Sequence, residues 1–155
     1  MSIPVRLLSR RALLLAAAAV LLPFSTAQSQ QGATPEISPA EARARASTGE
    51  MTLIDVRTPE EWRETGIAPG ATPINMYHPG GAEGFTKDVL ARVGGKRDAP
   101  IAVICRSGNR SSQVQRLLAA QGFTRVYNVS EGMSGSAAGP GWVKRGLPVE
   151  TCKTC

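Results

Sequence analysis

The segment that most constrains the fold is a short apolar run at residues 101–104, which a loop and a helical pattern follow directly. The run, Ile-Ala-Val-Ile, contains β-branched residues and therefore predicts a buried strand. The loop covers residues 105–110, and the pattern of residues 111–122 predicts a helix that a glycine closes. The sequence therefore predicts a strand, a short loop and a helix in direct succession.

A single cysteine, Cys105, opens this loop. A loop between a strand end and a helix N-terminus directs several free backbone N–H groups toward one point. The helix dipole, Arg106 and Arg110 add positive potential there, and Gly108 lets the backbone curl without a Cβ clash. We therefore expect Cys105 to have a pKa well below the usual value of ~8.5 and to act as a nucleophile.

The loop resembles the active-site loop of the rhodanese-like sulfurtransferases, in which a cysteine carries a persulfide. Further segments resemble family motifs in the family's order, although Ile67 stands where histidine is usual. These segments are Asp55-Val56-Arg57 with Glu61-Trp62, residues 66–71, Gly132-Met133, and residues 141–149. The resemblance covers residues 38–150 and implies a single rhodanese-like α/β domain with a mostly parallel central sheet and helices on both faces.

The resemblance also implies a chemistry. Cys105 would accept sulfane sulfur from thiosulfate or a similar donor and pass it to cyanide or a thiol. The loop residues Arg106, Ser107, Gly108, Asn109 and Arg110 would bind the substrate, with Ser107 and Asn109 shaping the loop through side-chain hydrogen bonds. Arg110 could instead brace the loop through carbonyl groups. No cofactor and no metal site is expected.

Two other functions compete with sulfur transfer by an enzyme. Phosphatase or arsenate reductase relatives use a longer loop with arginine six positions after the cysteine, where this chain has Ser111. Arginine falls five positions after Cys105, and a smaller ring of amides suits a single sulfur atom better than a phosphate. A non-catalytic persulfide carrier or redox partner module is the stronger alternative.

The first 27 residues predict a signal peptide, with cleavage near Ala27. Three arginines precede an apolar stretch over residues 12–22, which is too short to cross a bilayer. Arg10 and Arg11 also resemble a twin-arginine signal, and both export routes stay open. We therefore expect a periplasmic protein, without a membrane span in its mature form, that begins with a flexible lead-in at residues 28–37.

Removing residues 1–27 takes away three of the 18 basic residues, so 15 remain against 12 acidic ones and the net charge falls from +6 to +3. The remaining arginines are scattered without aromatic residues between them, which does not favour nucleic-acid binding. The mature length suits one domain, and we expect a monomer. Its partners would be small sulfur donors and acceptors, with a periplasmic thiol protein as a further possibility.

Three cysteines is an odd number for an oxidising compartment. Cys152 and Cys155 form a C-x-x-C pair in the tail, residues 151–155. The pair could be a structural disulfide, a dithiol that receives sulfur from Cys105, or half of an intermolecular zinc site. We predict a Cys152–Cys155 disulfide or redox-active pair rather than a stable bridge to Cys105.

Elsewhere the chain alternates between strand and helix patterns, as a parallel sheet requires. Strands are expected at residues 51–56, 73–76 and 125–129, with capped helices beginning at Pro39 and Pro59 and a further helix over residues 86–93. Residues 135–141 form a long Gly/Ala-rich loop. In such sheets, ligands bind at the carboxyl ends of strands, where Cys105 lies.

Five other residues have mainly structural interpretations. Arg57 is expected in an internal ion pair, with Glu61 as its candidate partner, although Asp55 and Arg57 could instead contact substrate. Trp62 and Trp142 are expected to pack in the core or at its rim. His78, the only histidine, is expected to be exposed in a Pro/Gly-rich loop.

Overall fold

The protein folds around a parallel sheet, as a computed structural model that describes residues 34–152 and 155 shows. The strands are β1 (Thr52–Asp55), β2 (Thr72–Pro73), β3 (Ile101–Ile104) and β4 (Val126–Asn128), in the order β2-β1-β3-β4. All neighbouring pairs run parallel, with Asp55 beside Ile104. The expected α/β architecture is confirmed.

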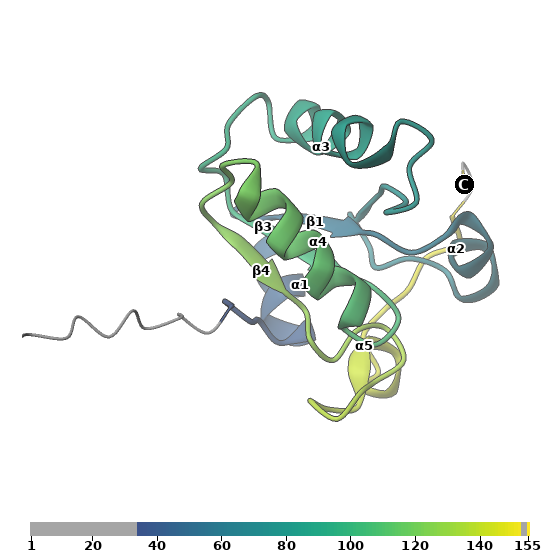
Figure 1. Cartoon of the computed structure of the whole chain (residues 1–155). Coiled ribbons are helices and arrows are strands. Elements are labelled where there is room, and N and C mark those ends of the chain that lie inside the picture. Colours follow the sequence, from purple (N-terminus) through teal and green to yellow (C-terminus); the bar gives the residue numbers. More distant parts are fainter. Residues whose placement is uncertain (1–33, 153–154) are drawn as a thin grey trace, which may run out of the picture. The chain divides into compact units, whose positions relative to one another are not determined.

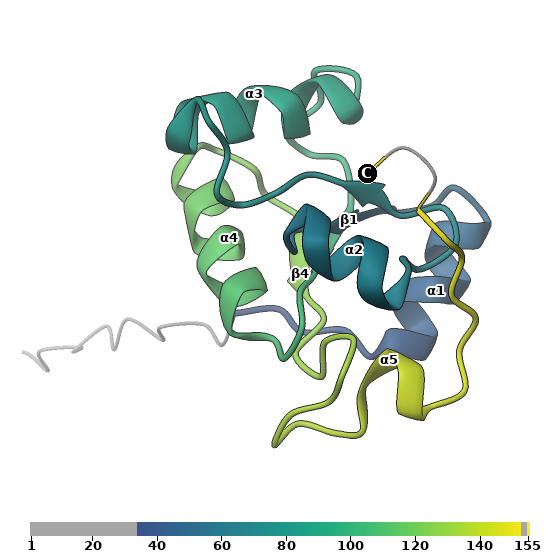
Figure 2. The same ribbon diagram turned by 90° about the vertical axis from the view of Figure 1, so that its right-hand side faces the viewer.

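The described residues also form five helices: α1 (Pro39–Ser47), α2 (Pro59–Thr65), α3 (Gly81–Arg92), α4 (Asn109–Ala120) and α5 (Gly141–Lys144). Helices α2, α3 and α4 connect consecutive strands, whereas α1 precedes β1 and α5 follows β4. Helices α3 and α4 lie on one side of the sheet, and α1 and α5 lie on the other (Figures 1 and 2). Strand β3 is buried on both sides, with Ile101 and Val103 in one hydrophobic cluster and Ala102 and Ile104 in the other. Cys105 directly follows β3, and its side chain packs in the same hydrophobic cluster as Ile101 and Val103.

The capped helix starts follow the sequence expectation. The Ser38 side chain accepts a hydrogen bond from the Glu41 backbone, with Pro39 at the first helical position of α1. Thr58 and Glu61 form the complete reciprocal capping box of α2. This box matters for the site, because it orients the first turn of α2, which carries Glu61.

Helix α3 begins five residues earlier than the expected start at residue 86. The glycines at its start, which favour a loop in the sequence, accommodate the His78 ring. A Cβ at Gly84 would lie 2.5 Å from His78 Nδ1, and the Gly80 backbone donates to this nitrogen at 2.9 Å. His78 Nε2 also lies 3.1 Å from Asp88 Oδ2, so the expectation of an exposed histidine is wrong: the side chain is 24% exposed.

Two shorter segments differ from expectation. Strand β2 covers Thr72–Pro73 rather than residues 73–76, although the Ile74 backbone still donates to the Asp55 carbonyl. The lead-in expected to be flexible ends in a segment paired with β4: Glu36 forms a parallel bridge with Asn128, whose N–H donates to the Pro35 carbonyl. Residues 35–37 therefore extend the sheet edge instead of hanging free.

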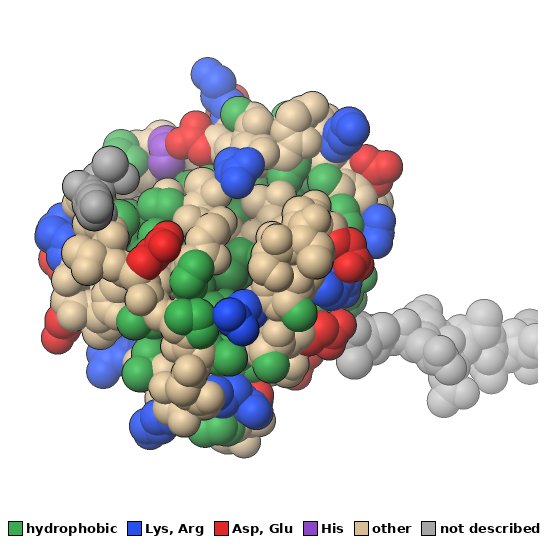
Figure 3. Space-filling view, turned by 180° about the vertical axis from the view of Figure 1, so that it is seen from behind, with side chains coloured by type: hydrophobic (Ala, Val, Ile, Leu, Met, Phe, Trp, Pro, Cys, Tyr) green, Lys and Arg blue, Asp and Glu red, His purple; other side chains and the backbone are tan. Residues whose placement is uncertain are grey.

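The predicted signal peptide lies outside the described residues. Among residues 34–152, no helix is long and apolar enough to cross a membrane. Basic and acidic side chains are interspersed on the face shown in Figure 3.

Candidate functional site

Cys105 lies at the carboxyl end of β3, and its side chain is buried, with 1% of its surface exposed. Its Sγ accepts a hydrogen bond from the Gly108 backbone N–H at 3.2 Å and another from the Ser111 hydroxyl at 3.3 Å. Helix α4 begins at Asn109, so its N-terminal end faces the same region. Two donors and a helix N-terminus are features that stabilise negative charge on a sulfur atom.

The backbone of the cysteine loop packs closely against the backbone of residues 130–132. Gly108 has a φ of +87°, and a Cβ at this position would collide with the Ser130 carbonyl oxygen. Gly132 has a φ of +66°, and a Cβ there would collide with the Arg106 carbonyl oxygen. Both positions therefore require glycine, for conformation as well as space.

Hydrogen bonds join the same two segments. The Met133 backbone donates to the Cys105 carbonyl, and the Ser134 backbone donates to the Arg106 carbonyl, each at 2.9 Å. The Asn128 amide donates weakly to the Gly108 carbonyl, at 3.4 Å. The segment after β4 therefore holds the first part of the cysteine loop in place.

Arg110 is held by a carboxylate from another helix. Its two terminal nitrogens donate to the two oxygens of Glu61 on α2, both at 2.6 Å. This bidentate pair is half-buried, and the hydrogen bond from Arg110 lowers the pKa of Glu61 to about 2. The carboxylate raises the pKa of Arg110 in turn. Arg110 thus braces the loop through a side chain rather than through carbonyl groups.

We expect Glu61→Gln to lower the free energy of unfolding by about 1–2 kcal/mol at pH 7. A partly buried, bidentate ion pair contributes more to stability than an exposed pair does. The folded-state pKa lies below the usual value near 4.5. The pair's contribution is therefore complete above pH 4.5 and is lost as the pH falls toward 2. Urea unfolding at pH 7 and at pH 3 would measure the gap between wild type and variant. A gap that widens on acidification would contradict the prediction.

Arg57 forms its ion pair with Asp55 rather than with the expected Glu61 carboxylate. Its Nη2 lies 2.6 Å from Asp55 Oδ2, and Nε donates to both carboxylate oxygens. Both side chains are almost fully buried. Arg57 also donates to the Gly66 carbonyl and to the Thr65 hydroxyl, so it ties the end of β1 to the end of α2.

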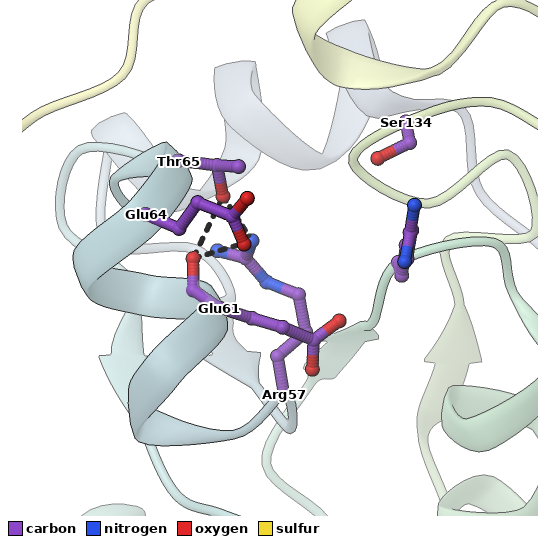
Figure 4. A pocket seen from close by; sticks show the side chains of 6 residues that line it. Arg57, Glu61, Glu64, Thr65 and Ser134 are labelled. Carbon is purple, nitrogen blue, oxygen red and sulfur yellow. Dashed lines mark hydrogen bonds between the residues drawn. The ribbon is translucent and has the colours of Figure 1, made fainter.

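A cavity of about 110 Å³ lies beside the loop. Figure 4 shows Glu64 and Thr65 on α2 facing Ser134 across an open space, with the Arg57 guanidinium bonded to Thr65. Arg106 is exposed, and within the described residues its guanidinium has no ion pair. The cavity is lined by Arg57, Glu61, Glu64, Thr65, Arg106 and Ser134.

The remaining predicted residues are placed as follows. Ser107, Gly108 and Asn109 line a separate pocket. The expectation that Ser107 and Asn109 shape the loop through side-chain hydrogen bonds is not met, because neither side chain makes one in the described part of the chain. Trp62 and Trp142 are buried, as expected, and Trp142 donates to the Pro148 carbonyl at 2.8 Å.

Cys152 and Cys155 form the predicted disulfide, and Cys105 is the free cysteine. The Arg63 guanidinium of α2 donates to the Cys155 carbonyl at 2.8 Å, which places the end of the tail beside this helix. Among the residues with described positions, no cluster of three or more potential metal ligands occurs.

Sequence reasoning missed three parts of the site. Ser111 was noted only as the position that a phosphatase arginine would occupy, although its hydroxyl contacts Sγ. Glu61 was assigned to Arg57, and Ser134 drew no attention. A hydroxyl in the first turn after a cysteine loop is the signal that could have identified Ser111.

The model of the rhodanese-like domain family matches residues 38–138, which include the cysteine loop and every residue that lines the cavity beside it. This chain belongs to the rhodanese-like domain family. The match spans well over half of the chain and agrees with the resemblance in the loop and in the Asp55–Trp62 region.

Relatives of this rhodanese-like domain include named sulfurtransferases. The chain is 41% identical over 103 residues to thiosulfate sulfurtransferase 16 of Arabidopsis thaliana chloroplasts, covering 63% of this chain and 78% of that protein. It is 31% identical over 104 residues to a sulfurtransferase of Allochromatium vinosum, covering 67% and 82%.

The fold also matches solved structures. The crystal structure of Rv0390 from M. tuberculosis has a TM-score of 0.59 and 27% sequence identity, covering 78% of this chain and all of that one. Together, the family match and the named relatives place this protein in a family associated with sulfur transfer.

Proposed function

We propose that this protein is a thiosulfate sulfurtransferase that works through a persulfide on Cys105. The observation that carries the proposal is the buried, unpaired Cys105 Sγ, which receives hydrogen bonds from Gly108 and Ser111 at the N-terminal end of α4. Because these donors stabilise negative charge on Sγ, the proposed reaction needs no neighbouring general base to activate Cys105. The named relatives support the same chemistry.

In the first step, the Cys105 thiolate attacks the outer sulfur of thiosulfate. The new S–S bond forms on Cys105 as the S–S bond of thiosulfate breaks, and sulfite leaves with the electron pair. In the second step, cyanide or a thiolate attacks the outer sulfur of the persulfide, and the Cys105 thiolate is the leaving group. The donors around Sγ stabilise negative charge in both steps.

Among Arg57, Arg106 and Arg110, Arg106 is the one without a carboxylate partner in the described residues, because Arg110 is paired with Glu61 and Arg57 is paired with Asp55. We propose that Arg106 attracts thiosulfate to the cavity beside the loop, while Arg110 keeps the loop in shape. Ser107, Gly108 and Asn109 contribute through the loop's backbone.

The test measures loading and turnover separately. Purified protein is incubated with thiosulfate, its intact mass is recorded, and thiocyanate formation from cyanide is followed over many turnovers. We expect a gain of one sulfur atom on Cys105 and ping-pong kinetics. Loading without repeated turnover would support the alternative, a persulfide carrier, and activity on an aryl phosphate would support the phosphatase alternative.

We further propose that the protein works in the periplasm after cleavage near Ala27. Sequencing the N-terminus of protein recovered from the periplasm would test this, and recovery of uncleaved protein in the cytoplasm would contradict it.

A further inference from the structure

The C-x-x-C disulfide of the tail takes no part in the proposed sulfur transfer, and its surroundings differ from those of Cys105. Cys105 is 1% exposed and lies in a hydrophobic cluster, whereas Cys152 and Cys155 are each partly exposed and belong to neither cluster. The tail lies beside α2, where Figures 1 and 2 mark the C end of the chain. A second molecule can therefore approach this pair without any opening of the core.

The disulfide contributes little to holding the fold together. It joins residues that are only three apart in sequence, and the stabilisation from a disulfide is smallest for such short loops. Backbone bonds already fix the tail just before the pair, because Glu150 and Ile67 exchange two N–H to carbonyl hydrogen bonds, each at 2.9 Å. The pair is thus held in place by contacts that do not depend on the S–S bond, as a disulfide that opens and closes requires.

A cation from α2 lies beside one of the two cysteines. Arg63 Nη1 donates to the Cys155 carbonyl at 2.8 Å, and Arg63 Nη2 lies 3.2 Å from Glu60 Oε1. The exposed Glu60 carboxylate partly neutralises this guanidinium, which stays bonded to Cys155. Positive charge beside a cysteine stabilises its thiolate, and a more stable thiolate leaves faster in disulfide exchange.

We infer that the tail is a second reaction centre, at which the Cys152–Cys155 disulfide exchanges with external dithiols. A thiolate of the dithiol attacks Cys152 Sγ, the bond between the two cysteines breaks, and the Cys155 thiolate leaves beside Arg63. The second thiolate of the dithiol then attacks its own sulfur in the mixed disulfide and releases the Cys152 thiolate. The dithiol is oxidised by two electrons to a disulfide, the pair is reduced by two electrons, and two protons pass to the pair.

The reacting molecule is a dithiol because the C-x-x-C ring recloses readily. After a monothiol attacks Cys152, the Cys155 thiolate is held three residues away and attacks the mixed disulfide before a second monothiol molecule arrives. A dithiol completes its own second step within one molecule, so it competes with this reclosure.

The test uses the Cys105→Ser protein, in which the tail cysteines are the only ones, with dithiothreitol as the dithiol. Alkylation followed by intact mass counts the thiols that appear with time. We expect dithiothreitol to reduce the pair about tenfold faster than it reduces oxidised glutathione, whereas 2-mercaptoethanol at equal thiol concentration should leave most of the pair closed. Samples quenched with acid during the reaction should carry the mixed disulfide on Cys152.

Two variants of α2 change the charge beside Cys155 in opposite directions. Arg63→Gln should slow the exchange about two- to fivefold, and Arg63→Lys should restore most of the rate. Glu60→Gln removes a carboxylate that bonds to Arg63 rather than to the tail, and it should accelerate the exchange about twofold. Arg116→Gln is the matched control, because Arg116 is an exposed arginine of α4 that bonds to Ser112, and it should leave the rate unchanged.

Three results would overturn the inference: exchange no faster than that of oxidised glutathione, a mixed disulfide on Cys155 instead of Cys152, or equal rates in Arg63→Gln and Glu60→Gln. The inference stands apart from the proposed sulfur transfer, because the exchange is measured in a protein without Cys105. Failure of wild-type Cys105 to load sulfur from thiosulfate would contradict the proposed function and leave the result for the tail unchanged.

Discussion

Cys105→Ser should abolish sulfur transfer, lowering thiocyanate formation by at least about a thousandfold, to the uncatalysed background. A serine hydroxyl stays protonated near neutral pH and cannot hold a persulfide. The replacement should preserve the fold, since an oxygen can accept the same hydrogen bonds from Gly108 and Ser111 that Sγ accepts. Thiocyanate assays and intact mass, both with thiosulfate present, measure the effect.

The matched control removes the other two cysteines instead. Cys152→Ser with Cys155→Ser deletes the tail disulfide, which closes only a short loop and contributes little to stability. Its turnover of thiosulfate and cyanide should equal that of wild type. Activity that persists in Cys105→Ser, or sulfur loaded from thiosulfate onto the tail cysteines of that variant, would show that the proposed nucleophile is wrong.

The local parts of the site could be read from the sequence. A buried strand, a loop with a cysteine and a glycine, and a following helix are set by residues next to one another, and their boundaries match the structure within a few residues. The capping boxes are local as well. Gly108 was expected to allow a tight curl, and its φ of +87° agrees.

The errors concern which side chains meet in the folded chain. Glu61 could pair with Arg57 or Arg110, and sequence spacing favoured the nearer residue. In the structure Arg57 pairs with Asp55 of the same segment, and Glu61 pairs with Arg110 on the distant loop. Only the folded sheet decides this choice. His78 shows the same limit: the glycines around it indicate a loop until the ring is seen packed against them.

These contacts form a chain of support that leads to the cysteine. The Asp55 carboxylate holds Arg57, Arg57 holds the end of α2, and Glu61 on α2 holds Arg110 in the loop. A defect at β1 should therefore be felt both in stability and at the loop. The Asp55–Arg57 pair is the place where such a defect has the largest consequence.

Asp55→Ala should lower the free energy of unfolding by about 3–5 kcal/mol, because it leaves the Arg57 guanidinium buried without a counter-charge. Asp55 is fully buried and Arg57 is 2% exposed, so water cannot replace the lost carboxylate. That loss is a large share of the stability of a typical domain. Urea unfolding at pH 7 measures it, with the m-value as the check for two-state behaviour.

A double-mutant cycle separates the buried charge from the loss of packing. In Asp55→Ala with Arg57→Met, the guanidinium is gone, and the double variant should be clearly more stable than the sum of the two single changes predicts. Glu60→Ala is the matched control, because its pair with Arg63 is exposed on both sides and should contribute less than about 1 kcal/mol. Additive losses in the cycle, or an Asp55→Ala effect as small as that of the control, would mean that the buried pair does not hold β1 to α2.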